Sequence, residues 1–224
     1  MHIRRRRRVA NAGMIDTFRK ELEVGKGHRT ASSPAFEGAS LQGREIAFLI
    51  AREGAEQSEM LRPWEAVTVA GGHPVLVCPQ EGEAQLFEHL DRGRLVPVDR
   101  TLADADPADF DALVLPGGVA NPDMLRTDPE AVRFAKAFFT AGKPVAAICH
   151  APWLLVEADV VRERTLTSWP SLRTDIANAG GDWRDERVVV CENGPNLLLT
   201  SRKPQDLPPF CEALVRRFAE ADAR

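Results

Sequence analysis

Apolar residues along most of the chain form short runs that alternate with segments of helical spacing. The runs have the length of buried strands and cover Glu45 to Ala51, Val75 to Cys78, Asp111 to Leu115, Val145 to Ile148, 166–168, 188–190 and 197–200. Helical spacing covers 59–70, 128–141, 172–179 and 207–221. Strands that alternate with helices predict an α/β fold, with a doubly wound, mostly parallel sheet and helices on both faces.

Three segments depart from this alternation. Residues 52–58 are polar and are predicted to form a loop at the carboxyl end of the first strand, and 79–107 give only weak local signals. Pro63 is expected in the first turn of the helix over 59–70. Residues 1–42 combine a basic run, Arg4 to Arg8, with a Gly/Ser/Thr-rich stretch, which predicts a mobile tail before one domain over 43–224.

Composition and charge limit the class of protein. A hydrophobic share of 44% and a charged share of 28% are ordinary for a soluble globular protein. Residues 1–40 hold nine Lys or Arg and four Asp or Glu, so the rest of the chain has 20 basic and 29 acidic residues. This acidic body argues against a nucleic-acid partner, and no apolar run has membrane-spanning length.

The cysteines are spaced neither as a disulfide framework nor as a metal site. They are Cys78, Cys149, Cys191 and Cys211, with no C-x-x-C pair and no ligand-like spacing of His, Cys or carboxylates. This pattern indicates reduced thiols in a cytoplasmic protein and no bound metal. No organic cofactor is expected either, because the glycines at 117 and 118 do not form a dinucleotide fingerprint.

Cys149 occupies an unusual position in the pattern. It follows the buried run Val145 to Ile148, and Pro152 directly afterwards is typical of the first turn of a helix. At such a strand–turn–helix elbow, free N–H groups and the helix dipole favour a thiolate, so Cys149 is a candidate nucleophile. The alternative is a buried, inert cysteine, the commoner role of a free thiol.

Other candidate site residues follow neighbouring strands. Ligands of such sheets bind at the carboxyl ends of the strands, where Gly117 and Gly118 can turn N–H groups toward an oxyanion, with the N–H of Ala151 opposite. Of the five histidines, only His150 adjoins the cysteine, and none follows it; the others are His2, His28, His73 and His89. A triad with a histidine late in the chain is therefore excluded.

Four motifs resemble the ThiJ/PfpI family of the class I glutamine amidotransferase-like superfamily. They are LVLPGG at 113–118, GKPVAAICHAP at 142–152, NAGG at 178–181 and TSRKPQDLP at 200–208. The resemblance spans about residue 43 to the C-terminus. It implies a flavodoxin-like fold, a reactive cysteine at the elbow and a homo-oligomer of two or more subunits.

The resemblance also implies roles for two acidic residues. A glutamate after the first strand contacts the family's cysteine; alignment with one extra loop residue places Glu56 there, with Glu53 and Glu59 as alternatives. An acidic residue of a neighbouring subunit completes the site, and the matching residue is Asp123. Alternatively, Asn121 caps a helix whose first turn holds Asp123. Trp153 replaces a commonly polar residue and is expected to narrow the pocket.

Three hypotheses for function remain open on the sequence. The resemblance implies a cysteine hydrolase that acts on glyoxal or methylglyoxal adducts or on peptide bonds, and a small site with a carboxyl beside the thiol favours the adducts. The second hypothesis is a redox-sensing or chaperone-like stress protein whose cysteine is oxidised without turnover. The third is a purely structural role.

Overall fold

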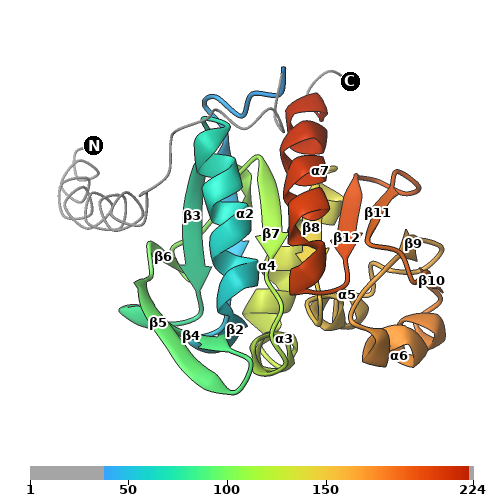
Figure 1. The fold of residues 1–224 in the computed structure, drawn as a ribbon, viewed down its shortest axis with the longest axis horizontal. Coiled ribbons are helices and arrows are strands. Elements are labelled where there is room, and N and C mark those ends of the chain that lie inside the picture. The colour runs from blue at the N-terminus through green and yellow to red at the C-terminus, as the bar shows by residue number, and fades with distance from the viewer. Residues whose placement is uncertain (1–37, 222–224) are drawn as a thin grey trace. The chain divides into compact units, whose positions relative to one another are not determined.

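The computed structural model describes residues 38–221, which form one α/β unit (Figure 1). Its centre is a seven-stranded sheet in the order β11-β12-β8-β7-β1-β3-β6. The strands are β1 Glu45–Leu49, β3 His73–Cys78, β6 Arg100–Thr101, β7 Ala112–Leu115, β8 Val145–Ile148, β11 Val188–Cys191 and β12 Leu198–Ser201. Every pair is parallel except β11 with β12. The predicted mostly parallel, flavodoxin-like sheet is therefore confirmed.

Helices cover both faces of this sheet. They are α2 Gln57–Val69, α3 Ala120–Arg126, α4 Pro129–Thr140, α5 Pro152–Glu157, α6 Arg173–Asn178 and α7 Leu207–Glu220, with single 3₁₀ turns at Pro107–Asp109, Pro170–Leu172 and Pro204–Asp206. α2 and α7 contact each other on one face in Figure 1, and α4 and α5 lie on the other. The predicted apolar side of α7, formed by Phe210, Leu214 and Phe218, is fully buried.

Two smaller sheets flank the main one. β2 Glu53–Glu56, β4 Glu83–Glu88 and β5 Asp91–Pro97 form one, and β9 Thr165–Leu166 pairs with β10 Asp182–Trp183 in the other. β4 and β5 pair antiparallel with a register shift, and β2 adds to β4 in parallel. The weak signals of 79–107 thus come from an irregular hairpin, in which alternation is confined to 83–86 of β4 and β5 buries only Val96.

Three local predictions are corrected by the structure. Residues 52–58 are not a loop, because they contain β2 and the start of α2. Since α2 begins at Gln57, Pro63 lies inside the helix rather than in its first turn, where it removes one backbone hydrogen bond. Leu41 is buried and its N–H donates to Ala70 O at 2.8 Å, so the folded part includes residues before Gly43. The remaining predictions for the basic tail lie outside the described residues.

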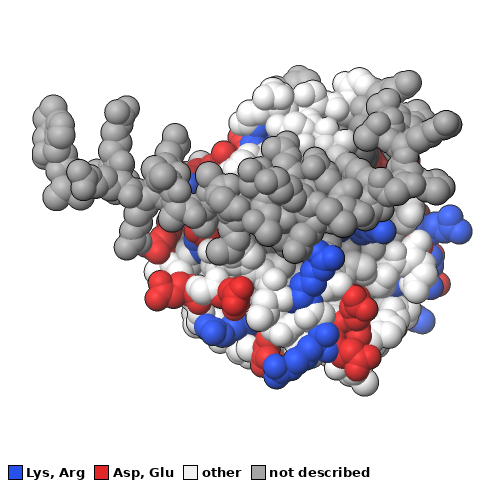
Figure 2. Space-filling view, turned by 60° about the vertical axis from the view of Figure 1, so that its left-hand side comes forward, with Lys and Arg blue, Asp and Glu red and all other residues white. Residues whose placement is uncertain are grey.

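Two surface properties bear on the class of protein. No helix among residues 38–221 is long and apolar enough to cross a membrane. On the described surface in view in Figure 2, basic and acidic side chains are interspersed.

Candidate active site

Cys149 lies on the strand–turn–helix elbow that its position in the sequence predicts. It follows β8, and α5 begins three residues later with Pro152 in its first turn. The backbone of Cys149 has a φ of 63°, a strained value for a residue other than glycine. Two hydrogen bonds hold the strained residue: its N–H donates to Ser201 O at 3.0 Å, and its carbonyl accepts from Trp169 N at 2.8 Å. Strain that the surroundings enforce in this way is typical of functional positions.

The carboxyl beside the sulfur belongs to Glu59, the third residue of α2. Its side chain is fully buried, and the carboxyl is near enough to the Cys149 thiol for each group to shift the pKa of the other. Oε2 accepts from Gly117 N at 3.0 Å, and Oε1 has no hydrogen-bond partner among the described residues. The structure therefore places one of the two alternatives, Glu59, at the position predicted for Glu56.

Glu56 points elsewhere because of β2. It ends this strand opposite Phe87 of β4, and its Oε2 accepts from His89 N at 3.0 Å. The chain then turns into α2, whose buried face starts with Glu59. Glu53, the other alternative, is exposed at the start of β2.

Burial controls the protonation of Glu59. Desolvation raises the pKa of this carboxyl to about 8, and the charge of Glu56 acts in the same direction. The hydrogen bonds with Cys149 and with the backbone of Gly117 and Gly118 oppose this shift. At neutral pH Glu59 is consequently a neutral acid, which can donate a hydrogen bond to the sulfur.

The thiol of Cys149 does not have the lowered pKa that the elbow predicts. Burial raises the pKa of this thiol, and the Glu59 charge raises it further. The N–H groups of Gly118 and His150 oppose the rise. Since Glu59 keeps its proton at neutral pH, its charge is then absent, and the two N–H groups stabilise a thiolate.

The backbone donors at the sulfur are Gly118 N–H and His150 N–H. Of the three N–H groups predicted to face an oxyanion, only that of Gly118 is thus beside the sulfur, because the N–H of Gly117 donates to Glu59 and the N–H of Ala151 donates to Ile148 O at 3.1 Å. His150, the second donor, lies in the turn between β8 and α5.

Both glycines of the 117–118 pair are required by space. A Cβ on Gly117 would lie 2.5 Å from Glu59 Oε2 and 2.6 Å from Cys149 Cβ. Gly118 has a φ of 84°, and a Cβ there would lie 2.1 Å from Gly54 O. Gly117 therefore lets the backbone pass between Glu59 and Cys149, and Gly118 lets it pass close to Gly54.

Asn121 holds this backbone in place and was not predicted to do so. Instead of capping α3, its buried amide accepts from Ala51 N at 2.7 Å and donates to Pro116 O at 2.9 Å and Gly117 O at 3.0 Å. It thereby joins the end of β1 to the turn after β7. Its place in LPGG-x-x-N, just after the glycine turn, is the only signal in the sequence.

The imidazole of His150 adjoins the thiol. Its Nδ1 lies 3.2 Å from Cys149 Sγ, and its Nε2 lies 3.4 Å from Ser171 Oγ. Trp169 stacks on the ring at 5.6 Å, and Trp153 is tilted against it at 5.3 Å. Burial lowers the pKa of His150 to about 4, so the ring is neutral at pH 7.

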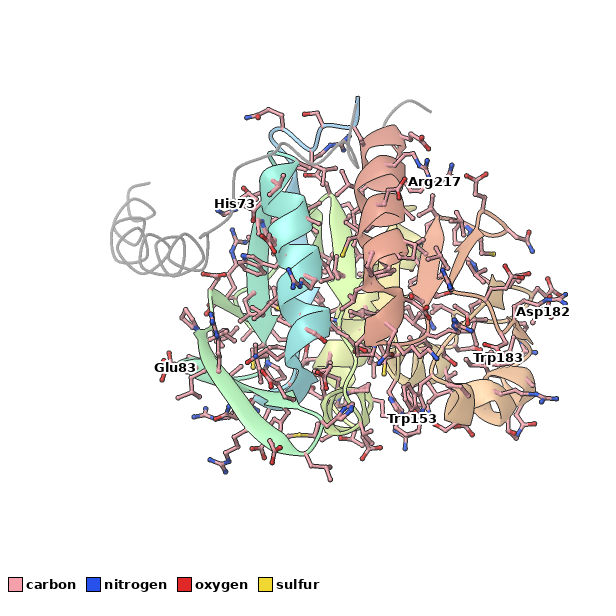
Figure 3. All side chains as sticks on the ribbon, in the orientation of Figure 1. His73, Glu83, Trp153, Asp182, Trp183 and Arg217 are labelled. Carbon is pink, nitrogen blue, oxygen red and sulfur yellow. The ribbon has the colours of Figure 1, made fainter. Side chains whose placement is uncertain are left out.

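Asp123 and Trp153 lie at the edge of this cluster. Asp123 forms an ion pair with Arg126 at 2.9 Å within the same chain, and the Arg126 guanidinium lies 5.0 Å from the centre of the Trp153 ring. Trp153 Nε1 donates to Asp175 at 2.8 Å, and Figure 3 shows Trp153 beside the α6 region. Trp153 thus packs against His150, and its effect on a substrate pocket stays a prediction.

Residues 38–221 contain no group of three or more His, Cys, Asp or Glu arranged to hold a metal ion. All four cysteines are buried and unbridged.

The fold and the site define an α/β protein with a cysteine at a strand–turn–helix elbow. The sequence model of the DJ-1/PfpI family matches residues 44–217, and the chain belongs to this family. It is 40% identical over 173 residues to "Protein/nucleic acid deglycase 2" of Escherichia coli (strain K12), which covers 77% of this chain and 96% of the relative. It is 38% identical over 167 residues to "Putative cysteine protease YraA" of Bacillus subtilis (strain 168), which covers 75% of this chain and 94% of the relative.

A solved structure also resembles the chain. It is a two-domain protein of Anabaena variabilis with DJ-1/ThiJ/PfpI-like and ferritin-like domains, with a TM-score of 0.72 and 33% identity. The match covers 80% of this chain and 49% of that one.

Proposed function

We propose that this protein is a hydrolase in which Cys149 attacks the carbonyl carbon of glyoxal or methylglyoxal adducts. The observation that carries the proposal is the Cys149 sulfur on a strained elbow, with the neutral acid Glu59 and the base His150 both in contact with it. The name of the Escherichia coli relative, a deglycase, supports this substrate class.

The geometry supports a definite first step. The sulfur forms a bond to the carbonyl carbon while the Cys149 S–H bond breaks and its proton moves to His150 Nδ1, 3.2 Å away. The electron pair of the carbonyl double bond moves to its oxygen in the same step. Gly118 N–H and His150 N–H are the donors for the negative charge that develops there. Glu59, in the role expected of Glu56, holds the sulfur and can pass its proton to the adduct.

Access to the sulfur favours a small substrate over a polypeptide. Cys149 is 6% exposed and His150 is 7% exposed, and Trp153 and Trp169 flank the imidazole. An adduct of a two- or three-carbon aldehyde needs little room, whereas an extended peptide needs a groove. Peptide bonds are the second candidate substrate because of the name of the YraA relative.

The redox alternative predicts an exposed thiol of low pKa. Cys149 is instead buried, which does not match an exposed sensor thiol. Its raised pKa slows oxidation and nucleophilic attack alike and does not separate the two functions. Mild peroxide treatment followed by mass spectrometry separates the two functions. Selective oxidation of Cys149, in a protein without activity on either substrate class, would favour the sensor.

The proposal includes a homo-oligomer in which Asp123 of one copy approaches His150 of another. Its support is the exposure of α3: Asp123 lies on this helix, and the neighbouring apolar side chains of Val119 and Met124 are 58% and 42% exposed. A monomer of full activity, or an Asp123→Asn variant with unchanged kcat, would remove Asp123 from the site. A cytoplasmic location and the lack of a nucleic-acid partner stay predictions.

The proposal is tested by assaying wild type and Cys149→Ser on methylglyoxal-treated thiols and amines and, in parallel, on fluorogenic peptides. Cys211→Ser is the matched control, because this buried cysteine lies on α7 away from the elbow. We expect activity on the adducts that requires Cys149 and not Cys211. Cysteine-dependent activity on peptides alone would change the substrate class, and equal activity of Cys149→Ser would refute the nucleophile.

A further inference from the structure

The outer nitrogen of the His150 ring has a partner within its own chain. Nδ1 faces Cys149 Sγ at 3.2 Å, and Nε2 faces Ser171 Oγ at 3.4 Å, so the imidazole bridges the thiol and a hydroxyl. We propose that Ser171 is a positioning residue: its hydroxyl accepts the Nε2 proton of His150 and leaves Nδ1 free to take the thiol proton. The inference rests on the proposed function, in which His150 exchanges a proton with Cys149.

The segment that carries Ser171 is fixed against the site. Ser171 lies in the 3₁₀ turn Pro170–Leu172, directly after Trp169, whose ring stacks on the imidazole at an interplanar angle of 23°. Trp169 N–H donates to the carbonyl of Cys149, which ties this segment to the elbow itself. The Ser171 hydroxyl therefore lies on a segment that is hydrogen-bonded to the backbone of Cys149.

A second tryptophan anchors the other end of this segment. Trp183 Nε1 donates to Ser168 Oγ at 2.9 Å, and Ser168 Oγ donates to Trp169 O at 2.9 Å. Figure 3 shows Trp183 close to α6, on the side of the molecule where Trp153 lies. Hydrogen bonds and stacking thus hold residues 168–171 beside His150.

A hydroxyl suits a ring that must stay neutral between proton transfers. In the neutral imidazole one nitrogen donates and the other accepts, and the partner at Nε2 decides which. With Nε2–H donating to Ser171, Nδ1 accepts from the Cys149 S–H. When this proton moves to Nδ1, a thiolate and an imidazolium form, and Nε2–H keeps its hydrogen bond. Since the Ser171 hydroxyl is uncharged, it stabilises the imidazolium less than a carboxylate would. The imidazolium therefore gives up its Nδ1 proton readily.

Several charged groups lie on the elements around the ring. Those on the elements packed against α5 are Asp123 and Arg126 of α3, Glu130, Arg133 and Lys136 of α4, and Arg173 and Asp175 of α6; Glu59 of α2 lies beyond the sulfur. The pairs on α3 and α4 are internal ion pairs, Asp175 accepts from Trp153, and Glu59 contacts Cys149. Within the described chain, Ser171 is accordingly the direct partner of Nε2.

The test compares Ser171→Ala, Ser171→Thr and Ser171→Asp with wild type, and uses Thr174→Ala on the exposed start of α6 as the matched control. The readouts are the ¹⁵N NMR shifts of the His150 ring against pH and the pH dependence of Cys149 alkylation by iodoacetamide. Neither readout requires turnover. A protein that gives the expected shifts but acts on neither substrate class would refute the proposed function and leave this inference standing.

In Ser171→Ala we expect a smaller population of the Nε2–H tautomer and alkylation slowed about fivefold, the value of one ordinary hydrogen bond. Ser171→Thr keeps the hydroxyl and should match wild type, as should Thr174→Ala. Ser171→Asp places a carboxylate at Nε2, so the His150 titration should rise by about one pH unit or more from its position near 4.

Three results would overturn the inference. The first is a Ser171→Ala protein with the shifts and alkylation profile of wild type. The second is a Ser171→Thr protein that behaves as Ser171→Ala. The third is a pH profile of Cys149 alkylation that changes in Asp123→Asn and not in Ser171→Ala. The partner of Nε2 would then be a carboxylate of a second copy.

Discussion

Replacing Glu59 by Gln should stabilise the protein at pH 8 and leave its stability at pH 5 almost unchanged. In the unfolded chain this carboxyl loses its proton near pH 4.5, whereas in the folded protein burial raises the pKa to about 8. Between these pH values the folded state binds more protons, so the free energy of unfolding falls as the pH rises. The glutamine is neutral at every pH and removes this loss, while its amide oxygen can still accept from Gly117 N–H.

The size of the effect follows from the same shift. A change from 4.5 to about 8 corresponds to about 5 kcal/mol, at about 1.4 kcal/mol per pH unit. Exchange of the proton with Cys149 reduces this figure, because the buried pair then carries one shared charge. We therefore expect Glu59→Gln to exceed wild type by at least about 2 kcal/mol at pH 8.

The assay is urea unfolding of wild type and Glu59→Gln at pH 5, 6, 7 and 8, with the difference in free energy as the result. Groups that titrate alike in both proteins contribute equally to both free energies of unfolding, so their contributions cancel in the difference. The matched control is Glu53→Gln, which removes an exposed carboxylate at the start of β2 and should follow the wild-type pH profile. A difference that does not change with pH, or one that Glu53→Gln shows equally, would refute the reasoning.

Three further predictions concern neighbouring groups. Because the folded pKa of His150 is lowered to about 4, wild type should lose stability as the pH falls from 6.5 to 4, and His150→Asn should lose less over this range in the same urea assay. Gly117→Ala would place a Cβ 2.6 Å from Cys149 Cβ, so it should lower the unfolding free energy by about 2 kcal/mol or more; a variant of wild-type stability would contradict the tight approach. Arg164→Met should lower the unfolding free energy by about 3 kcal/mol, because the buried guanidinium donates to two backbone carbonyls and its removal leaves both unpaired. An unchanged thermal midpoint would refute this role of Arg164.

The main sheet and its helices were predictable because their signals are local. β8, α4 and α7 begin and end within about one residue of the predicted bounds, since each is an apolar run or stripe closed by Pro or Gly. β2, β4 and β5 were not predictable, because their sequences are largely polar and they pair only with each other. Their stability comes from tertiary pairing that periodicity does not record.

The site residues likewise differ in whether local sequence or tertiary pairing places them. Cys149 and His150 were predictable because one continuous segment places them, while the choice between Glu56 and Glu59 depended on β2. One signal in the sequence did favour Glu59: it precedes Pro63 and Ala66 by four and seven residues, which puts it on the buried face of α2. Ser171 lies 21 residues beyond His150, and only the folded chain brings the two together.

The most direct test of this account is mass spectrometry of the protein quenched during turnover of methylglyoxal-treated thiols, in wild type and in Cys149→Ser. The account predicts a covalent adduct on the peptide that contains Cys149, and the loss of both adduct and activity in the variant. An adduct confined to Cys78, Cys191 or Cys211, or turnover that survives in Cys149→Ser, would contradict the assignment of Cys149 as the nucleophile.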